Sequence, residues 1–311
     1  MNKETVPESG EGSEERFSRI LIIGVPAVFV AILLVFCLAY GVIPGPELIV
    51  LCFFMYAAYD KRSRRFLKDW FPFVALLLGY EAFYGLIPSL SRTVHVTWPI
   101  DADLRLFGSV PTLVLQQYFR SPFLDYMGAF FYSLHFVLPV VFAFVLWRFY
   151  PKNYGKYTMT LVVGTYAALI TFLFYPVAPP WSGVNATRVL FQLDQHLGVP
   201  FYRTIFDFVQ SNPNAAFPSL HSMYPWLISL YAFKIVRMKA LPVLVLPFGV
   251  WFSTVYLGEH YVVDVIGGVV YGTLAFLFVE TVIPYIIQKR SNGLTRVERK
   301  ELTIPQNAER R

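Results

Sequence analysis

The sequence predicts an all-α integral membrane protein, a polytopic bundle of about eight transmembrane helices with an amphipathic helix at the membrane interface. Composition is the first reason, because 56% of the 311 residues are hydrophobic and 15% are charged, against roughly 45–50% and about 25% in soluble domains. Spacing is the second, because the apolar residues fall into blocks of about 18 to 25 residues. Aromatic residues are the third: they make up 18% of the chain, several at block ends, where membrane interfaces favour Tyr and Trp.

The N-terminal region begins with a polar tail. Residues 1–16 are rich in Glu, Ser and Gly, and such a composition cannot offset the entropy lost on ordering, so we expect a disordered acidic tail. The apolar run at 20–40 is too long for a signal peptide and lacks a basic start. We interpret it as a retained anchor, which forms an N-terminal membrane region over 17–90 with the next two blocks.

Seven further apolar blocks follow the anchor, each near the length that crosses a bilayer. The block at 47–59 is the shortest and is a candidate re-entrant segment. Residues 91–285 form the main membrane domain, and residues 286–311 a flexible basic tail. The seven blocks are 47–59, 70–87, 123–149, 157–175, 218–233, 241–257 and 261–287.

Basic residues indicate which ends of the helices are cytoplasmic. With eight spans, every cluster of Lys and Arg falls on one side, as the positive-inside rule requires, and both termini are then cytoplasmic. The loops 91–122, 177–217 and 258–259 face outward, to a periplasm or an organelle lumen. Residues 101–120 are amphipathic, so we expect a helix lying at the interface. The basic clusters are 61–68, 148–156, 234–239 and 289–300.

Charge and cysteine content exclude several function classes. The net charge of +6 does not indicate a nucleic-acid partner, because the basic residues flank apolar blocks instead of lining one face. Cys37 and Cys52 both lie inside apolar blocks, so neither a disulfide framework nor a cysteine zinc site is expected. We expect membrane lipids as the partners of this chain, and no metal or cofactor.

Two of the histidines have neighbours suited to a reactive centre. Pro218 suits the first position of a helix, which puts His221 in the first turn. His260 and Asp264 are four residues apart, so we expect both on one helical face, with the carboxylate holding the ring. Both histidines then lie near helix N-termini at the outer face, where free N–H groups favour an anion such as phosphate.

Several motifs recur in order along the chain. The segment Pro-Ser-Leu-His at 218–221, and Ser253 followed by His260 and Asp264, resemble two motifs of the type 2 phosphatidic acid phosphatase (lipid phosphate phosphatase) superfamily. The inositol phosphorylceramide synthase branch is closer still. It is similar to this chain at 175–181 (Tyr-Pro-Val-Ala-Pro-Pro-Trp), 216–222, 253–257 and 260–264.

The chain departs from the phosphatase pattern in two places. Thr254 follows Ser253 where the phosphatases have Arg, and no Lys-x6-Arg-Pro segment precedes Pro218. The synthase branch lacks these residues in the same way. The resemblance covers about 100–285 and implies a core of six helices that carries the catalytic residues.

The resemblance also implies roles for individual residues. His260 is the nucleophile that attacks phosphorus, and Asp264 fixes its tautomer. His221 is the acid that protonates the leaving oxygen and then takes a proton from the acceptor. No metal is required, because positioned donors can stabilise the developing charge. The expected phosphate-binding groups are Ser219, the backbone of Leu220 and His221, and Arg188.

Other residues have functional and structural interpretations of similar weight. His135 is either a packing residue or a donor in the substrate pocket, and Glu81 is either a functional intramembrane acid or a partner of a neighbouring helix. His95 and His196 lie in outer loops and are expected to be solvated. The remaining expected pocket residues are Tyr175, Pro179, Pro180, Trp181 and Tyr261.

Three functions are compatible with this pattern. The first is a membrane phosphotransferase that moves a phospho-head group, such as phosphoinositol, from a phospholipid to a lipid or polyol hydroxyl through a phosphohistidine. The second is a metal-independent phosphatase of lipid or prenyl phosphates, which shares every step until water replaces the acceptor. The third is a transporter whose polar residues line a path, and in that case replacing His260 abolishes no phosphoryl chemistry.

Overall fold

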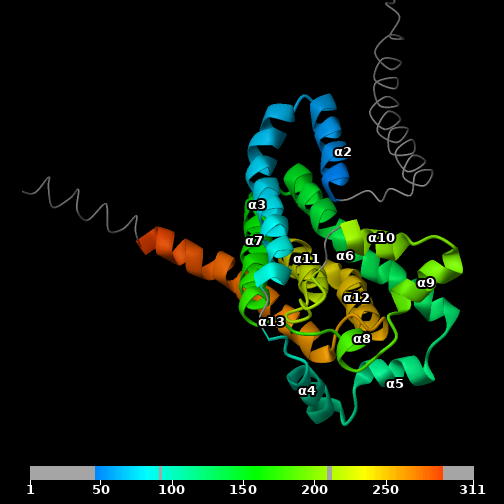
Figure 1. Ribbon diagram of the computed structural model, residues 1–311. Helices are drawn as coiled ribbons and strands as arrows, with labels where there is room; N and C mark the ends of the chain where they lie inside the picture. Colours follow the sequence, from blue (N-terminus) through cyan, green and yellow to red (C-terminus); the bar gives the residue numbers. More distant parts are fainter. Residues whose placement is uncertain (1–45, 91–92, 209–211, 290–311) are drawn as a thin grey trace, which may run out of the picture.

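The computed structural model describes residues 46–90, 93–208 and 212–289 (Figure 1). Within these ranges the regular secondary structure is helical, with isolated β-bridges at Val177 and no strand, which confirms the all-α class. The expected acidic tail at 1–16 and the anchor at 20–40 lie outside the described residues. The C-terminal helix continues to Lys289, beyond the start at 286 that we expect for the tail, and the rest of that tail lies outside the described residues.

Each of the other predicted blocks corresponds to a helix. The two N-terminal ones are α2 (Pro46–Tyr59) and α3 (Ser63–Leu90). The next are α6 (Pro122–Phe149) and α7 (Pro151–Phe174), joined by Tyr150. The last are α11 (Leu220–Val236), α12 (Val245–Tyr256), and α13 (Val262–Leu277) continued by the π-helical turn η2 (Phe278–Val282).

Four helical runs in the described ranges are long and apolar enough to cross a membrane: Pro122–Phe149, Pro151–Phe174, Leu220–Tyr256 and Val262–Lys289. The run Leu220–Tyr256 folds back on itself. Arg237 has a φ of 55°, the 3-10 helix η1 (Arg237–Leu244) follows it, and α11 and α12 pack against each other. This run therefore supplies both of the blocks predicted at 218–233 and 241–257.

Two boundaries differ from the sequence prediction. The helix α3 begins at Ser63, so most of the basic cluster at 61–68 belongs to a helix and not to a loop. The interfacial helix expected at 101–120 is two helices, α4 (Thr97–Phe107) and α5 (Pro111–Tyr118). Gly108 ends α4 with a φ of 71°, a conformation that glycine adopts without strain, and Pro111 suits the start of α5.

Short helices connect the long ones. They are α4, α5, α8 (Pro180–Gly183), α9 (Val189–Leu197) and α10 (Phe201–Phe208). Figure 1 shows α4, α5 and α8 at the end opposite to the connection between α2 and α3. This is the end at which α11 and α13 begin, since the α13 start contacts Asp103 of α4 and the α11 start contacts Asp264.

The helices α11 and α13 approach each other closely near their first turns. A Cβ atom on Gly268 of α13 would lie 2.1 Å from the Ser219 carbonyl oxygen and 2.2 Å from Ser222 Oγ. The Ser222 hydroxyl lies within hydrogen-bond distance of the carbonyls of Ser219 (2.9 Å) and Val265 (3.1 Å), and the Ser219 amide donates to the Asp264 carbonyl at 3.0 Å. The start of α11 is thereby fixed against the first turns of α13.

A carboxylate from the peripheral helix α4 caps α13. Asp103 is fully buried and accepts hydrogen bonds from the amides of Val262 (3.1 Å) and Val263 (3.0 Å). These are first-turn amides, which have no acceptor within their own helix, and a negative charge suits the positive end of the helix dipole. Burial raises the pKa of the Asp103 carboxyl, and the two amides act in the opposite direction.

The Gly268 contact predicts a loss of stability on adding a single methyl group. Gly268→Ala places a Cβ against backbone, which cannot move without separating α11 from α13, so we expect a loss of about 1–3 kcal/mol from overpacking. Gly155→Ala in α7 is the matched control, because nothing lies within 4 Å of its Cβ position. Thermal unfolding of the purified proteins in detergent measures both. An unchanged melting temperature for Gly268→Ala would contradict the close approach.

The Asp103 cap predicts that the same substitution changes stability at Asp103 but not at Asp101 of the same helix. Asp103→Asn keeps the shape of the side chain but leaves one oxygen to serve two amides, so we expect a loss of about 1–3 kcal/mol. Asp101→Asn on the exposed side of the same helix is the control and should leave unfolding unchanged. Equal melting temperatures for the two variants would show that Asp103 does not hold the start of α13.

Candidate active site

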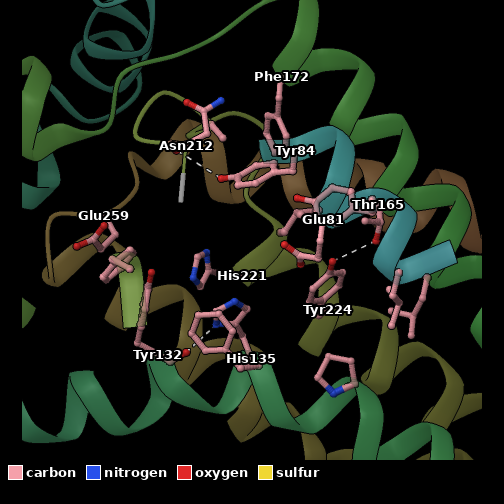
Figure 2. Close-up of a pocket in the computed structure, with 18 of the residues that line it drawn as sticks. Glu81, Tyr84, Tyr132, His135, Thr165, Phe172, Asn212, His221, Tyr224 and Glu259 are labelled. Carbon is pink, nitrogen blue, oxygen red and sulfur yellow. Dashed lines mark hydrogen bonds between the residues drawn. The ribbon is translucent and has the colours of Figure 1, made fainter. Parts of the chain in front are cut away.

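A cavity of about 260 Å³ lies between the long helices, and Trp181 of α8 and Phe206 of α10 also line it. One part of its wall is polar and holds His221, His260, Arg188 and Glu259. Another part is apolar and comes from α2, α3, α6 and α7, with Val50, Phe73, Val74, Leu77, Leu78, Val140 and Leu161. Figure 2 shows the labelled side chains, with His221 near the centre of the view. The cavity therefore combines titratable groups with a lining that suits a lipid chain.

His221 lies in the first turn of α11, as the sequence predicts, but the helix begins differently. Its first residue is Leu220 and its N-cap is Ser219, whose hydroxyl accepts a hydrogen bond from the Ser222 amide at 3.3 Å. Pro218 precedes the cap and does not open the helix, because a serine hydroxyl can satisfy a first-turn amide and a proline cannot. Ser219 is fully buried and is not part of the cavity wall, unlike Leu220.

His260 precedes α13 instead of lying on it. The N-cap of this helix is Tyr261, and Asp264 is its third residue. The Asp264 carboxylate accepts a hydrogen bond from the Tyr261 amide at 2.9 Å and lies 3.6 Å from His260 Nδ1. The expected proximity of ring and carboxylate is thus present, but the capping turn creates it, and the expectation of a shared helical face is wrong.

The two histidine rings contact each other directly. His221 Nδ1 and His260 Nε2 are 3.0 Å apart, although 39 residues separate them in the chain. The Asp264 carboxylate faces His260 Nδ1, and a proton held on that nitrogen leaves Nε2 with a free lone pair. The arrangement can supply a nucleophilic nitrogen and a proton carrier side by side.

Arg188 lines the cavity and is tightly held. Its guanidinium donates to the Glu259 carboxylate at 2.8 and 3.3 Å. The guanidinium carbon also lies 4.5, 4.1 and 4.3 Å from the ring centres of Trp181, Phe191 and Phe206, distances typical of cation–π contacts. Arg188, the cation that the sequence predicts for phosphate binding, is thus bonded to the residue that precedes His260. Sequence reasoning did not identify this carboxylate partner, Glu259.

His135 is a cavity residue with a defined orientation. Its Nδ1 donates to the Tyr132 carbonyl at 2.9 Å, and its ring centre lies 3.7 Å from that of His221. Tyr132 stacks on His221 with a centroid distance of 4.4 Å. These rings hold the His221 side chain from the side of α6, which agrees with the pocket interpretation of His135.

The residues expected around the proline segment divide into two groups. Pro179 and Trp181 line the cavity, whereas Tyr175, Pro180 and Tyr261 are not part of its wall. Tyr175 stacks on His95 at 3.8 Å. His95 is partly exposed, and its backbone bonds to Pro176 (2.9 Å) and Ala178 (3.0 Å).

A glutamine that the sequence did not single out joins the segment before Arg188 to the end of α12. Gln116 of α5 donates to the carbonyls of Thr187 and Tyr256, both at 2.9 Å, and accepts from the Thr187 amide at 2.8 Å. It thereby fixes the residue before Arg188 next to the end of α12. In the sequence, the amphipathic pattern of 101–120 is the feature that could have indicated Gln116. That pattern does not show which polar residue faces the bundle.

Acidic and histidine side chains gather here, but no metal cluster is present in the described part of the chain. No group of three or more His, Cys, Asp or Glu side chains in these ranges is placed to hold a metal ion. The polar groups of the cavity instead pair with one another, as His221 does with His260 and Arg188 with Glu259.

Comparison with known proteins gives a family match and three relatives. A family model described as the PAP2 superfamily matches residues 97–278. Phosphoinositol dihydroceramide synthase of Bacteroides thetaiotaomicron is 29% identical over 239 residues, which cover 67% of this chain and 75% of that protein. Inositol phosphorylceramide synthase of Candida albicans is 28% identical over 169 residues, 47% of this chain and 33% of that protein.

The third relative is the catalytic subunit of inositol phosphorylceramide synthase of Saccharomyces cerevisiae, 31% identical over 120 residues, 33% of this chain and 29% of that protein. No solved structure matches the chain. The relatives confirm the resemblance to the inositol phosphorylceramide synthase branch, and with it a membrane enzyme of the phosphatase or phosphotransferase type. The matched segment runs from α4 to α13, contains both contacting histidines and Asp264, and covers more than half of the chain, which therefore belongs to the PAP2 superfamily.

Proposed function

We propose that this enzyme transfers a phospho-head group, with phosphoinositol as the first candidate, from a phospholipid to the hydroxyl of a second lipid through a phosphohistidine. The names of the relatives support a phosphoinositol group and a ceramide-type acceptor. The observation that carries the proposal is the 3.0 Å contact between His221 and His260 in a cavity whose other walls are largely apolar.

In the first half of the reaction, His260 is the nucleophile. The phosphoryl group of the donor enters between the two rings, and His260 Nε2 attacks phosphorus while Asp264 holds the proton on Nδ1. The bond from phosphorus to the lipid oxygen breaks as the bond from phosphorus to nitrogen forms. His221 gives its proton to the leaving oxygen, which departs as a neutral lipid alcohol.

In the second half, the acceptor hydroxyl replaces that alcohol. It gives its proton to His221, its oxygen attacks phosphorus, and the bond to His260 breaks, so both histidines return to their initial states. The apolar walls favour a lipid at this stage, because they bury its chains and leave little room for water. With water as the acceptor, the same steps would give hydrolysis.

Charge on the transferred group is balanced by fixed donors. Arg188 lies in the same part of the wall as His260, and the first-turn amides of α11 at Leu220 and His221 have no acceptor within their own helix. Donors that are already in place cost no reorganisation when charge develops. Ser219 is a weaker candidate than the sequence indicates, because its hydroxyl caps α11.

We also propose that the site faces the periplasm or an organelle lumen. Both histidines belong to the helix ends next to α4 and α8, whereas Lys156 and Lys234, which pair with Glu280, lie at the opposite ends of their helices. The positive-inside rule makes the latter end cytoplasmic.

Transfer of a labelled head group tests the function. Purified protein in detergent is given phosphatidylinositol labelled in its head group together with a ceramide or a diacylglycerol, and mass spectrometry follows labelled lipid, free head-group phosphate and inorganic phosphate. We expect a new labelled lipid from the wild type, and a loss of about a thousandfold or more in His260→Ala.

His196→Ala, at an exposed histidine, is the control and should keep full activity. Release of soluble phosphate without a new lipid, again lost in His260→Ala, would replace the transferase by a phosphatase. Equal activity of His260→Ala and the wild type would contradict the assignment of the nucleophile.

The covalent intermediate predicts a labelled protein. When the donor carries labelled phosphate and no acceptor is added, rapid quenching should leave label on the wild type that is stable to alkali and lost in acid, as expected for a bond from phosphorus to nitrogen. His260→Ala should take up none, and peptide mapping should locate the label at residue 260. Transfer without any labelled intermediate in the wild type would exclude this route.

A further inference from the structure

The helix α3 contributes a carboxylate to the cavity wall. Glu81 follows the apolar stretch Phe73–Gly79 and lines the cavity that also contains His221 and His260. The residue is exposed, in contrast to the buried Asp264 and Asp103. The sequence predicts a membrane span at 70–87, in which an acidic side chain is costly and is usually retained for function. The mechanism above does not use Glu81.

Hydroxyl groups surround this carboxylate. Figure 2 shows Glu81 beside Tyr224 of α11 and Thr165 of α7, with Tyr84 nearby on its own helix. The hydroxyls of Thr165 and Tyr224 are 3.1 Å apart, and the Tyr84 hydroxyl donates to the Asn212 carbonyl at 3.4 Å. All five residues line the cavity. Glu81, Tyr84, Thr165, Asn212 and Tyr224 form a polar patch, here called the Glu81 patch, on a wall that is otherwise apolar.

The Glu81 patch lies about one turn of α11 further from the start of that helix than His221. Tyr224 follows His221 by three residues on α11, so the two share a face and are separated by about 4.5 Å along the helix. A ligand whose reacting hydroxyl lies at His221 and whose chains run along the cavity therefore passes Glu81. At about 1.5 Å per bond, a group at this depth is about three or four bonds from that hydroxyl.

The chemistry of a carboxylate limits which groups can bind there. An ionised carboxylate only accepts hydrogen bonds, and its two oxygens offer about four acceptor sites, so it can bind a ligand in addition to protein partners. An amide N–H or a hydroxyl satisfies such a site. An ester presents only acceptors and would face the carboxylate without a donor, which costs about 1–3 kcal/mol.

We propose that Glu81 is a specificity-determining residue, which accepts a hydrogen bond from an amide N–H or second hydroxyl of the acceptor lipid, close to the hydroxyl that receives the head group. The proposal rests on the transferase function proposed above. It assigns to the enzyme a preference for acceptors built on an N-acyl amino alcohol over acceptors built on glycerol esters.

The test compares two acceptors that differ in this donor. A ceramide has a primary hydroxyl with a neighbouring amide N–H, and a diacylglycerol has a primary hydroxyl with a neighbouring ester. We expect the ratio of kcat/KM for the ceramide to that for the diacylglycerol to fall by about tenfold to a hundredfold in Glu81→Leu. Glu81→Gln, which keeps an acceptor oxygen without the charge, should retain an intermediate ratio.

A matched variant separates recognition from a change in cavity shape. Leu78 lies three residues before Glu81 and also lines the cavity, but it offers no polar group. Leu78→Ala should change transfer to both acceptors by similar factors and leave their ratio unchanged. Thermal unfolding of each variant checks folding. If Glu81→Leu does not fold, the ratio of kcat/KM for the two acceptors is measured in Glu81→Gln instead.

Binding gives a readout that does not depend on transfer. Native mass spectrometry measures how much of each acceptor stays bound to wild type, Glu81→Leu and Leu78→Ala after equal exposure. We expect the wild type and Leu78→Ala to retain more ceramide, and Glu81→Leu to retain the two lipids equally. If the wild type transfers to neither lipid but shows this pattern of retention, the transferase function fails while the role of Glu81 stands.

Two results would overturn the proposal. One is an unchanged ratio of ceramide to diacylglycerol, in both transfer and retention, when Glu81 is replaced. The other is a rise in KM for the phospholipid donor alone, which would show that Glu81 contacts the hydroxyls of the head group instead.

Discussion

The close approach of α11 and α13 is the constraint on which the site depends. His221 lies in the first turn of α11 and His260 directly precedes the N-cap of α13, and a hydrogen bond between the two rings tolerates only a few tenths of an ångström. Gly268 lets the backbones meet, and the Ser219 and Ser222 contacts fix the relative depth of the first turns. A side chain at position 268 would move one ring away from the other, so the chemistry is set by packing beneath the histidines.

Sequence reasoning found the residues whose role depends on neighbours in the chain. The helices followed from hydrophobic blocks, and the pairing of His260 with Asp264 followed from their spacing and from the family resemblance. It did not find Asp103, because this carboxylate acts on amides 159 and 160 residues away, and no local pattern indicates such a contact. It also misjudged Pro218 and Ser219, since a proline and a capping serine both suit a helix start and only the backbone shows which residue is the cap.

The cavity is built from two parts of the chain, one inside and one before the segment that matches the family model. The matched segment 97–278 supplies the histidines, Asp264 and Arg188, whereas α2 and α3 lie before it and supply much of the apolar wall together with Glu81. The candidate catalytic residues thus lie in the matched segment, and part of the apolar cavity wall comes from outside it. Relatives that share the histidines can therefore differ in the lipids they accept, which is a general property of sites built on common folds.

The environment of Arg188 has a consequence for how tightly a substrate is held. A free arginine side chain samples many rotamers, and restricting it on binding costs about 2 kcal/mol. In this protein three aromatic rings and the Glu259 carboxylate already restrict it, so that loss of freedom occurs once, during folding, and not each time a lipid arrives. Under the proposed function the guanidinium is preorganised for a phosphate, and binding then incurs less of this entropic cost.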